Sequence, residues 1–268
     1  MRELERDDLP SPLSDAALAV VGRGRVGGSI ARAAELAGID VRLAGRDDLP
    51  EACRDATAVL LCVPDDAIPE VSSAVAIAGP PPLIGHASGA GTLAVLAAAT
   101  ERGAAVFSLH PLQTFADAAT PTEGTPAAIA GSEESALVFA RALAEALGMR
   151  PFEVPEENRA TYHAAAAMAS NLLIALEESA AQLLEGAGVS DSRELLTPLV
   201  LRTAANWAER GPDALTGPIA RGDRATVERH RAVLADTAPE LLPAYDALAE
   251  RAQEVAAART RASEEVSA

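Results

Sequence analysis

The chain has 268 residues, of which 49% are hydrophobic and only 3% aromatic, and its formal net charge is −17. At roughly 150 residues per domain, this length predicts about two domains. The acidic balance argues against binding to nucleic acid or to an anionic membrane, because both attract positively charged patches. No apolar run reaches the roughly 20 residues of a membrane-spanning helix, and the charged N-terminus is unlike a signal peptide. We therefore expect a cytoplasmic protein.

All 22 basic residues are arginine, and lysine is absent from the sequence. This absence excludes a lysine Schiff base, a Walker-A phosphate loop and a lysine proton donor. A coding bias toward arginine and alanine explains it most simply, so the absence limits the chemistry without revealing a function. The two cysteines, Cys53 and Cys62, predict neither a disulfide framework nor a metal site.

The chain begins with a polar segment, residues 1–15, that predicts a flexible tail. From residue 16 to 155, short apolar runs alternate with alanine-rich helical stretches, including Ser29–Ala37. This alternation predicts an α/β domain with a mostly parallel sheet. The predicted strands are Leu18–Val21, Val41–Ala44, Ala58–Val63, Leu83–His86, Ala104–Leu109, Ala127–Ala130 and Phe152–Val154.

After residue 155 the strand signals stop, and residues 156–268 predict an all-α domain. Its first helix is predicted over Glu156–Gly186, and a cap at Ser190–Glu194 opens a second one. Two further helices are predicted over Asp223–Ala235 and Pro239–Ala262.

A glycine-rich turn follows the first predicted strand. Gly22, Gly24 and Gly27 match the spacing G-x-G-x-x-G, with Arg23, Arg25 and Val26 between them. The first glycine permits a tight turn, the second lets the backbone approach a pyrophosphate, and the third lets the helix pack on the strand. Because the motif lies between a strand and a helix, it predicts a Rossmann-like dinucleotide-binding domain.

The end of the second strand indicates which dinucleotide binds. NAD enzymes usually carry an acidic residue there for the ribose, whereas Arg46 holds that place here. A guanidinium can grip a 2′-phosphate, and Arg23 and Arg25 can add positive charge, so we predict NADP. The alternatives are that Arg46 is a solvated loop residue and that Asp47 reaches the ribose.

The segment Val63-Pro64-Asp65-Asp66 follows the third strand. In dinucleotide-binding folds the chain passes close to the cofactor there, so Val63 and Pro64 are predicted cofactor contacts. For Asp65 and Asp66 the favoured interpretation is that one of them caps the next helix.

Two of the four histidines, His86 and His110, lie at predicted strand ends. Ligands of open α/β sheets bind beyond the carboxyl ends of the strands, and histidine is the natural proton carrier near neutral pH. His110 is followed by Pro111, which fixes its backbone, and Ser88 lies close after His86. We take His110 and Ser88 as catalytic candidates, the alternative being that each only hydrogen-bonds a turn.

The long helix contributes two more candidates. His163, Ala167 and Asn171 have i, i+4, i+8 spacing, which places them on one helix face. Asn171 is a polar residue in an apolar run. The structural alternatives are an asparagine with a local hydrogen bond and a histidine satisfied between domains.

Six segments in order resemble a bacterial two-domain family within the 6-phosphogluconate dehydrogenase-like group. They are Gly22–Gly27, Val63–Ile68, His86–Ala90, His110–Phe115, Tyr162–Ala166 with Ser170-Asn171, and Thr216–Asp223. The family joins a Rossmann-like domain to a helical domain of unknown function. Related enzymes include ketopantoate reductases, pyrroline-5-carboxylate reductases and prephenate dehydrogenases.

The resemblance implies site residues by position. Prephenate dehydrogenases have a strand-end serine followed by a catalytic histidine before proline, which Ser88 and His110 match. Hydroxyisobutyrate-type enzymes have a catalytic lysine four residues before an asparagine. Asn171 matches that asparagine, but Ala167 holds the lysine position. The expected proton donor is therefore His110, with His163 as the second choice.

We accordingly expect an NADP-dependent oxidoreductase that transfers a hydride between the nicotinamide and a small carboxylate-bearing carbonyl or alcohol. A ketopantoate-like substrate is one candidate. The resemblance further implies that the helical domain contributes to the substrate site and to a homodimer. The alternative is a non-catalytic NADP-binding sensor or structural protein, which the missing lysine favours slightly.

Overall fold

The computed structural model describes residues 12–13, 16–45, 47–76 and 81–267, and side-chain surroundings up to residue 261. Most of the predicted tail and the predicted cofactor residue Arg46 lie outside the described residues. The chain divides into two compact units, Met1–Ser170 and Asn171–Ala268. The division falls later than the predicted boundary after residue 155, because the first helix beyond that point counts with the first unit.

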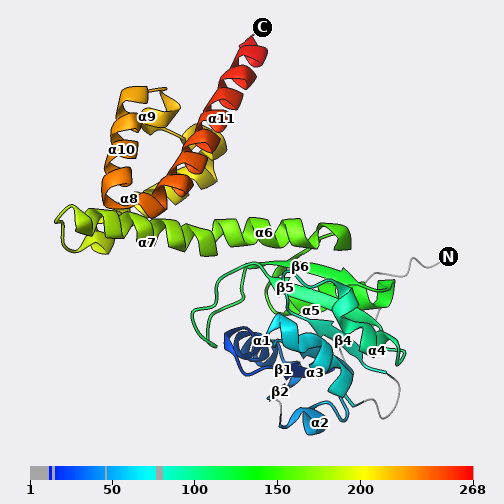
Figure 1. Ribbon diagram of the computed structural model, residues 1–268. Helices are drawn as coiled ribbons and strands as arrows, with labels where there is room; N and C mark the ends of the chain where they lie inside the picture. Colours follow the sequence, from blue (N-terminus) through cyan, green and yellow to red (C-terminus); the bar gives the residue numbers. More distant parts are fainter. Residues whose placement is uncertain (1–11, 14–15, 46, 77–80, 268) are drawn as a thin grey trace. The chain divides into compact units, whose positions relative to one another are not determined.

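The first unit is built on one seven-stranded sheet with the order β2-β1-β3-β4-β5-β6-β7 (Figure 1). All neighbouring strands are parallel except β5 and β6, which are antiparallel. The strands are β1 Ala17–Val21, β2 Asp40–Ala44, β3 Ala58–Leu61, β4 Leu83–His86, β5 Val106–Pro111, β6 Pro126–Gly131 and β7 Arg150–Glu153. The predicted fold class and all seven predicted strands are confirmed.

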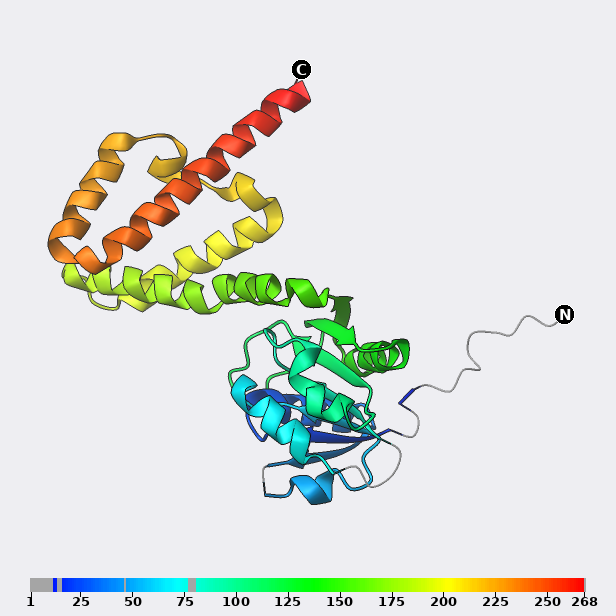
Figure 2. The same cartoon turned by 45° about the vertical axis from the view of Figure 1, so that its right-hand side comes forward.

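Helices cover both faces of this sheet (Figures 1 and 2). Along β1, Leu18 and Val20 pack toward α1 (Arg25–Leu36) and α5 (Glu134–Ala146). Ala19 and Val21 point to the other face, where α2 (Leu49–Ala52), α3 (Ile68–Ala74) and α4 (Ala97–Thr100) pack. Successive side chains of a strand alternate between faces, so a continuously apolar strand signals burial on both sides.

The long predicted helix is interrupted. A 3₁₀ turn, η4 (Glu156–Asn158), leads into α6 (Arg159–Ala169), which ends the first unit. Ser170 leaves the helical conformation, with φ −127° and ψ −77°, and its N–H bonds to Ala167 O at 3.4 Å. The next helix, α7 (Asn171–Gly186), belongs to the second unit. The prediction of one uninterrupted helix was therefore wrong, and no glycine or proline marks the break.

The second unit is helical, as predicted. After α7 it contains α8 (Ser192–Arg210), α9 (Gly217–Ala220), α10 (Arg224–Thr237) and α11 (Leu242–Ser267), with 3₁₀ turns η5 (Gly211–Ala214) and η6 (Pro239–Leu241). Asp223 caps α10, because its carboxylate accepts from the Thr226 N–H at 3.1 Å. The predicted cap of α8 differs: Asp191 stands at the N-cap with φ 58° and makes no side-chain cap bond.

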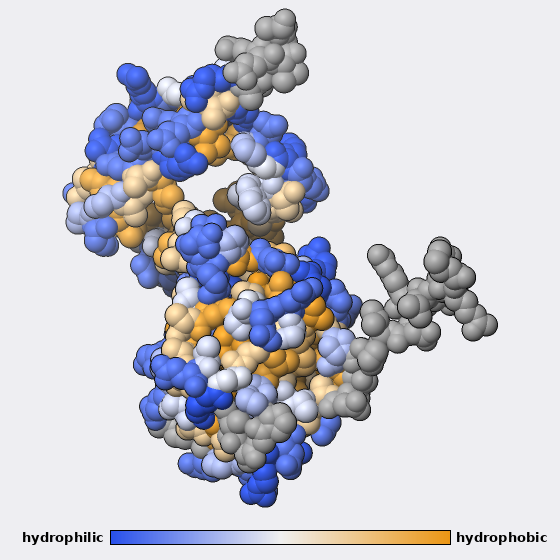
Figure 3. All heavy atoms as spheres, turned by 90° about the vertical axis from the view of Figure 1, so that its right-hand side faces the viewer, coloured by the Kyte–Doolittle hydropathy of each residue, from blue (hydrophilic) through white to orange (hydrophobic). Residues whose placement is uncertain are grey.

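This helical unit buries few apolar side chains. Among its described residues the buried apolar ones are Ala181, Leu234, Ala238 and Ala249. Trp207 is 67% exposed, and apolar side chains reach the molecular surface among polar ones (Figure 3). None of the helices in the described part of the chain has the length and apolarity needed to span a membrane.

Candidate functional site

The glycine-rich loop owes its shape to two close backbone contacts. Gly22 has φ +123°, and a side-chain carbon there would overlap the carbonyl oxygen of Cys62. A carbon on Gly27 would overlap the carbonyl oxygen of Gly22. These two glycines are therefore required by the loop itself, independently of any ligand.

Gly24 is different, because nothing lies within 4 Å of the place where its Cβ would be. It is the N-cap of α1, so the amides of the first helical turn, which begins with Arg25 and Val26, face outward. An open glycine at a helix N-terminus leaves room for a phosphate close to those amides. The loop thus has the form that a dinucleotide pyrophosphate requires.

The charges around the loop are partly paired. Arg23 forms an ion pair with Asp48, so its charge is already engaged. The Gly45 N–H donates to the Asp48 carboxylate at 2.8 Å, and this bond, together with Arg23, lowers the pKa of Asp48. Arg25 is exposed.

A cavity of about 240 Å³ lies beside the loop at the ends of β1 and β2. Pro64, whose contact with a cofactor stays a prediction, contributes to its wall. It is lined by Val21, Gly22, Gly45, Leu49, Pro50, Val63, Pro64, Ala67, Glu70, Val71 and Ala74. The flat face of an aromatic ring such as adenine suits this largely apolar lining.

A second cavity, of about 220 Å³, connects the loop to the predicted catalytic residues. β4 and β5 are parallel, with His86 opposite Ser108, so their carboxyl ends meet at one edge of the sheet. The lining residues are Val26, Cys62, Val63, Asp65, Ala87, Ser88, Gly89, His110, Pro111, Gln113, Phe115 and His163. We call this space the histidine cavity. It brings together the predicted residues Val26, Val63, Ser88, His110 and His163.

His110 is held by a tyrosine from helix α6. Its Nδ1 lies 2.6 Å from the hydroxyl oxygen of Tyr162, and the two rings meet edge to face. Phe152 packs on the other side of Tyr162, with ring centroids 6.0 Å apart. Burial raises the pKa of Tyr162 to about 12, so the phenol keeps its proton at neutral pH. His110 and Tyr162 therefore form a hydrogen-bonded pair with a defined geometry.

Ser88 and Gly89 form the floor beside this pair. The Ser88 hydroxyl accepts from the Gly91 N–H at 2.8 Å, which leaves its own proton free to donate. A Cβ on Gly89 would lie 2.7 Å from His110 Nε2 and 2.7 Å from His163 Cδ2. Only a glycine at this position lets both imidazoles approach the backbone.

His86 lies beneath the cavity and is fully buried. Its Nδ1 accepts from the Ser88 N–H at 3.2 Å, which places the ring proton on Nε2. That buried nitrogen has no hydrogen bond of normal geometry among the described residues. Burial, and after it the charge of Arg159, lowers the pKa of His86 to about 4. His86 is therefore a neutral ring that holds the backbone of Ser88 by accepting its N–H.

His110 is also neutral at physiological pH. Burial is the main cause, followed by the positive charge of Arg159, and together they lower its pKa to about 4 against the opposing charge of Asp65. A neutral imidazole can accept a proton readily, but it is a weak proton donor. The predicted role of His110 as the proton donor in a reduction therefore needs surroundings in which its pKa is higher than it is here.

Three further residues that the sequence singled out are Asn171, Asp65 and Asp66. Asn171 opens α7 in the second compact unit, so its place beside Ser88 and His110 stays a prediction. Neither Asp65 nor Asp66 caps a helix, because both lie within the 3₁₀ turn η2 (Asp65–Ala67), whose N-cap is Pro64. Asp65 instead lines the histidine cavity.

Sequence reasoning gave no role to Tyr162 or Arg159. Its position directly before the candidate His163 is the signal in the sequence that could have pointed to Tyr162. Nothing in the sequence marks Arg159 as buried, although none of its side chain is exposed.

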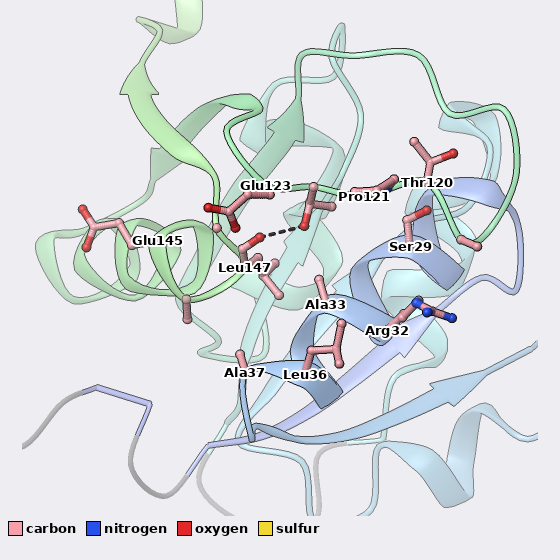
Figure 4. Close-up of a pocket in the computed structure, with 14 residues that line it drawn as sticks. Ser29, Arg32, Ala33, Leu36, Ala37, Thr120, Pro121, Glu123, Glu145 and Leu147 are labelled. Carbon is pink, nitrogen blue, oxygen red and sulfur yellow. Dashed lines mark hydrogen bonds between the residues drawn. The ribbon is translucent and has the colours of Figure 1, made fainter.

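Another cavity in the first unit, of about 590 Å³, lies away from these residues. Helix α1, the loop around Thr120 and the end of α5 form its walls (Figure 4), and among its lining residues Thr122 donates to Leu147 O at 2.7 Å. Its described lining contains no histidine or cysteine, and we assign it no chemistry. Likewise, the described residues include no cluster of three or more potential metal ligands.

Comparison with known families agrees with this architecture. A Rossmann-like domain model matches residues 42–111, and the domain of unknown function DUF2520 matches residues 125–252. The chain combines a Rossmann-like domain with a DUF2520 domain. No curated protein matches the sequence.

Several solved structures share this two-part fold. A Bacteroides fragilis protein provisionally named an NADP oxidoreductase aligns with TM-score 0.75 and 22% identity, over 90% of this chain and 99% of its own. A reductive aminase from Aspergillus terreus, solved with NADPH and ethyl levulinate, aligns with TM-score 0.65 and 19% identity, over 88% of this chain and 93% of its own. Pyrroline carboxylate reductase from Plasmodium falciparum, solved with NADP, aligns with TM-score 0.58 and 13% identity, over 91% of this chain and 99% of its own. At these identities the similarity establishes the fold.

Proposed function

We propose that this protein is an oxidoreductase that uses NADP to transfer a hydride to or from a small carbonyl or alcohol substrate that bears a carboxylate. One observation carries the proposal. Val26 of the glycine-rich loop and His110, which is hydrogen-bonded to Tyr162, border the same cavity. A phosphate-binding loop and a proton-accepting group that share one space suit dinucleotide-dependent proton and hydride chemistry.

The residues present fit a dinucleotide. The open side of Gly24 and the first amides of α1 would hold the pyrophosphate, and the cavity bordered by Pro64 and Gly45 would hold the adenosine. When bound, the nicotinamide supplies or takes up a hydride. The Bacteroides, Aspergillus and Plasmodium proteins, whose descriptions name NADP or NADPH, support the same cofactor class.

The protein's own groups would manage the proton. Ser88 can donate a hydrogen bond to a substrate oxygen, and His110 Nε2 can accept a proton when Nδ1–H donates to Tyr162. Asp65 lines the cavity, and none of its described lining residues is an arginine. The reacting carbonyl or hydroxyl therefore belongs in this space, and the substrate carboxylate is better held elsewhere.

The choice of NADP over NAD rests on Arg46, which lies outside the described residues. We expect Arg46→Ala to weaken NADP binding at least tenfold and to leave NAD binding unchanged, because only NADP carries the 2′-phosphate. Calorimetric titration with both dinucleotides measures this. Equal affinities that the substitution does not alter would contradict the assignment.

Turnover tests the catalytic claim. The protein is incubated with NADPH and a panel of 2-oxo acids, including ketopantoate, and of cyclic imines, and with NADP and the matching alcohols. We expect His110→Ala to reduce any turnover by about 10²-fold, the ordinary contribution of a positioned acid–base group. Binding of NADPH without turnover across the panel would favour a non-catalytic sensor.

We further propose that the helical unit forms a homodimer with a second copy of the chain. Helices α7 and α8 expose large apolar side chains, namely Leu172, Leu173, Ile174, Leu176, Leu195, Leu199, Leu201 and Trp207, each at least 40% exposed. A helical unit of this length needs more apolar burial than the four buried apolar residues of its described part, Ala181, Leu234, Ala238 and Ala249, supply. An identical chain is the partner that is always present in equal amount.

The dimer is tested by charge insertion. Leu199 is 63% exposed on α8, and Val138 is 47% exposed on α5 of the first unit. We expect Leu199→Glu to produce monomers or unfolded protein in sedimentation experiments and Val138→Glu to sediment as the wild type does. A wild-type chain that sediments as a monomer would refute the dimer.

A cytoplasmic location is part of the same proposal. Both cysteines are free thiols, which suits a reducing compartment.

A further inference from the structure

A buried arginine lies directly behind the histidine cavity. Arg159 is the first residue of α6, and none of its side chain is exposed. Its Nη2 donates to Ser108 Oγ at 2.7 Å, and its Nε donates to Gly91 O at 3.3 Å. Burying a guanidinium costs free energy unless it is paired and hydrogen-bonded, so such a residue is retained for a reason.

These hydrogen bonds join the three segments that carry the candidate site. Ser108 lies on β5, two residues before His110. Gly91 lies in the loop after β4, where its N–H holds the Ser88 hydroxyl at 2.8 Å. Arg159 itself lies one helical turn before Tyr162 on α6. One side chain therefore ties together the backbones that position Ser88, His110 and Tyr162.

The charge of Arg159 is only partly neutralised. The nearest carboxylate is Glu156, whose Oε1 is 4.0 Å from Arg159 Nε and whose Oε2 accepts from the Leu93 N–H at 2.6 Å. Arg159 Nη1 and Glu156 Oε1 are buried, and within the described residues neither has a hydrogen-bond partner. The guanidinium is thus a buried positive charge without a close ion pair.

We propose that Arg159 is a positioning residue whose buried charge opposes protonation of His110 while its hydrogen bonds fix the segments that carry Ser88 and His110. The inference rests on the proposed function, which it deepens by assigning the direction in which the site transfers the proton. A neutral His110 takes the proton that a substrate hydroxyl loses, with the bond forming at Nε2. The site is then arranged for removal of a proton rather than for its donation at neutral pH.

The other charged and titratable groups around His110 do not cancel this effect. They are Asp65 from the turn after β3, His86 from β4, and Tyr162 and His163 from α6. Only Asp65 favours the protonated ring. After burial, Arg159 is the strongest cause of the lowered pKa of His110, ahead of His163.

Nuclear magnetic resonance of the histidine rings tests the proposal in the full chain without cofactor or substrate. The chain has four histidines, so substituting His86, His163 and His230 one at a time assigns the His110 signal. We expect wild-type His110 to be neutral at pH 6. Arg159→Gln should raise the pH at which His110 titrates by about one unit, the effect of removing one nearby like charge. Arg159→Lys should retain the low value.

Arg102 provides the matched control. It is an arginine of the same unit that donates to Val75 O at 2.7 Å and to Ser72 O at 2.6 Å, and it does not line the histidine cavity. We expect Arg102→Gln to leave the His110 titration unchanged. If Arg159→Gln does not fold, a wild-type His110 that is charged at pH 6 still overturns the proposal.

A His110 that is charged at pH 6, or one whose titration is identical in Arg159→Gln and wild type, would overturn the proposal. Failure of the protein to bind NADPH would instead refute the proposed function and leave this titration result standing.

Discussion

Substitution by alanine should have different effects on stability at two glycines of the same loop. Gly22→Ala places a side chain at φ +123° and against the carbonyl of Cys62. The strained backbone costs about 1–3 kcal/mol and the overlap about 1–3 kcal/mol, so we expect a loss of about 2–6 kcal/mol in unfolding free energy. Gly24→Ala adds a methyl group where nothing lies within 4 Å, so the fold should be unaffected.

Dinucleotide binding should separate the two variants further. At about 2–4 °C per kcal/mol, Gly22→Ala should lower the unfolding temperature by roughly 5–20 °C. Gly24→Ala should unfold like the wild type but bind NADPH at least tenfold more weakly, because its methyl group occupies the space assigned to the pyrophosphate.

Thermal unfolding followed by circular dichroism, together with calorimetric titration of NADPH, measures both effects. The reasoning fails if Gly24→Ala destabilises the fold as much as Gly22→Ala does. It also fails if a folded Gly24→Ala variant binds NADPH with wild-type affinity.

Two more predictions concern the residues around the histidine cavity. Gly89→Ala should reduce turnover by about 10²-fold with little change in stability, because the added Cβ displaces His110 and His163 by a large fraction of an ångström or more. Gly186→Ala is the control, because nothing lies within 4 Å of the place of its Cβ. An unchanged turnover rate in Gly89→Ala would contradict the geometry of the site. The folded-state pKa of His86, about 4, is below its ordinary value of 6.5, so the unfolded chain binds the extra proton and stability is lost as the pH falls through this window. Urea unfolding should show about 2 kcal/mol less stability at pH 5 than at pH 6.5 from this group. His86→Asn should remove that contribution and His230→Asn should keep it, whereas equal slopes in wild type and His86→Asn would show that the ring is not held neutral.

Much of the fold follows from local pattern. Strands such as Val59–Leu61 are apolar at every position, because helices cover both faces of the sheet, and this continuous signal locates strands well. The glycine spacing located the turn between β1 and α1 for a steric reason that the backbone contacts of Gly22 and Gly27 confirm. The break at Ser170 was missed because alanine-rich sequence precedes it, and the low helix propensity of Ser170 and Asn171 is too weak a signal to end a helix by itself.

The candidate site was only partly predictable. Parallel strands end at one sheet edge, so Ser88 and His110 could be placed together from sequence alone. Their partners depend on tertiary contacts: Tyr162 and Arg159 reach His110 and Ser108 from a helix about 50 residues further along the chain. The protonation state of His110 depends on that burial and charge, so the sequence could suggest histidine chemistry but not its direction.

The central claim is that the first unit binds a nicotinamide dinucleotide next to His110. Calorimetric titration of the full chain with NADPH, repeated with Gly24→Ala, tests it most directly. The account predicts saturable binding with one site per chain in the wild type and a large loss of affinity in the folded variant. The absence of saturable binding to the wild-type protein would contradict it.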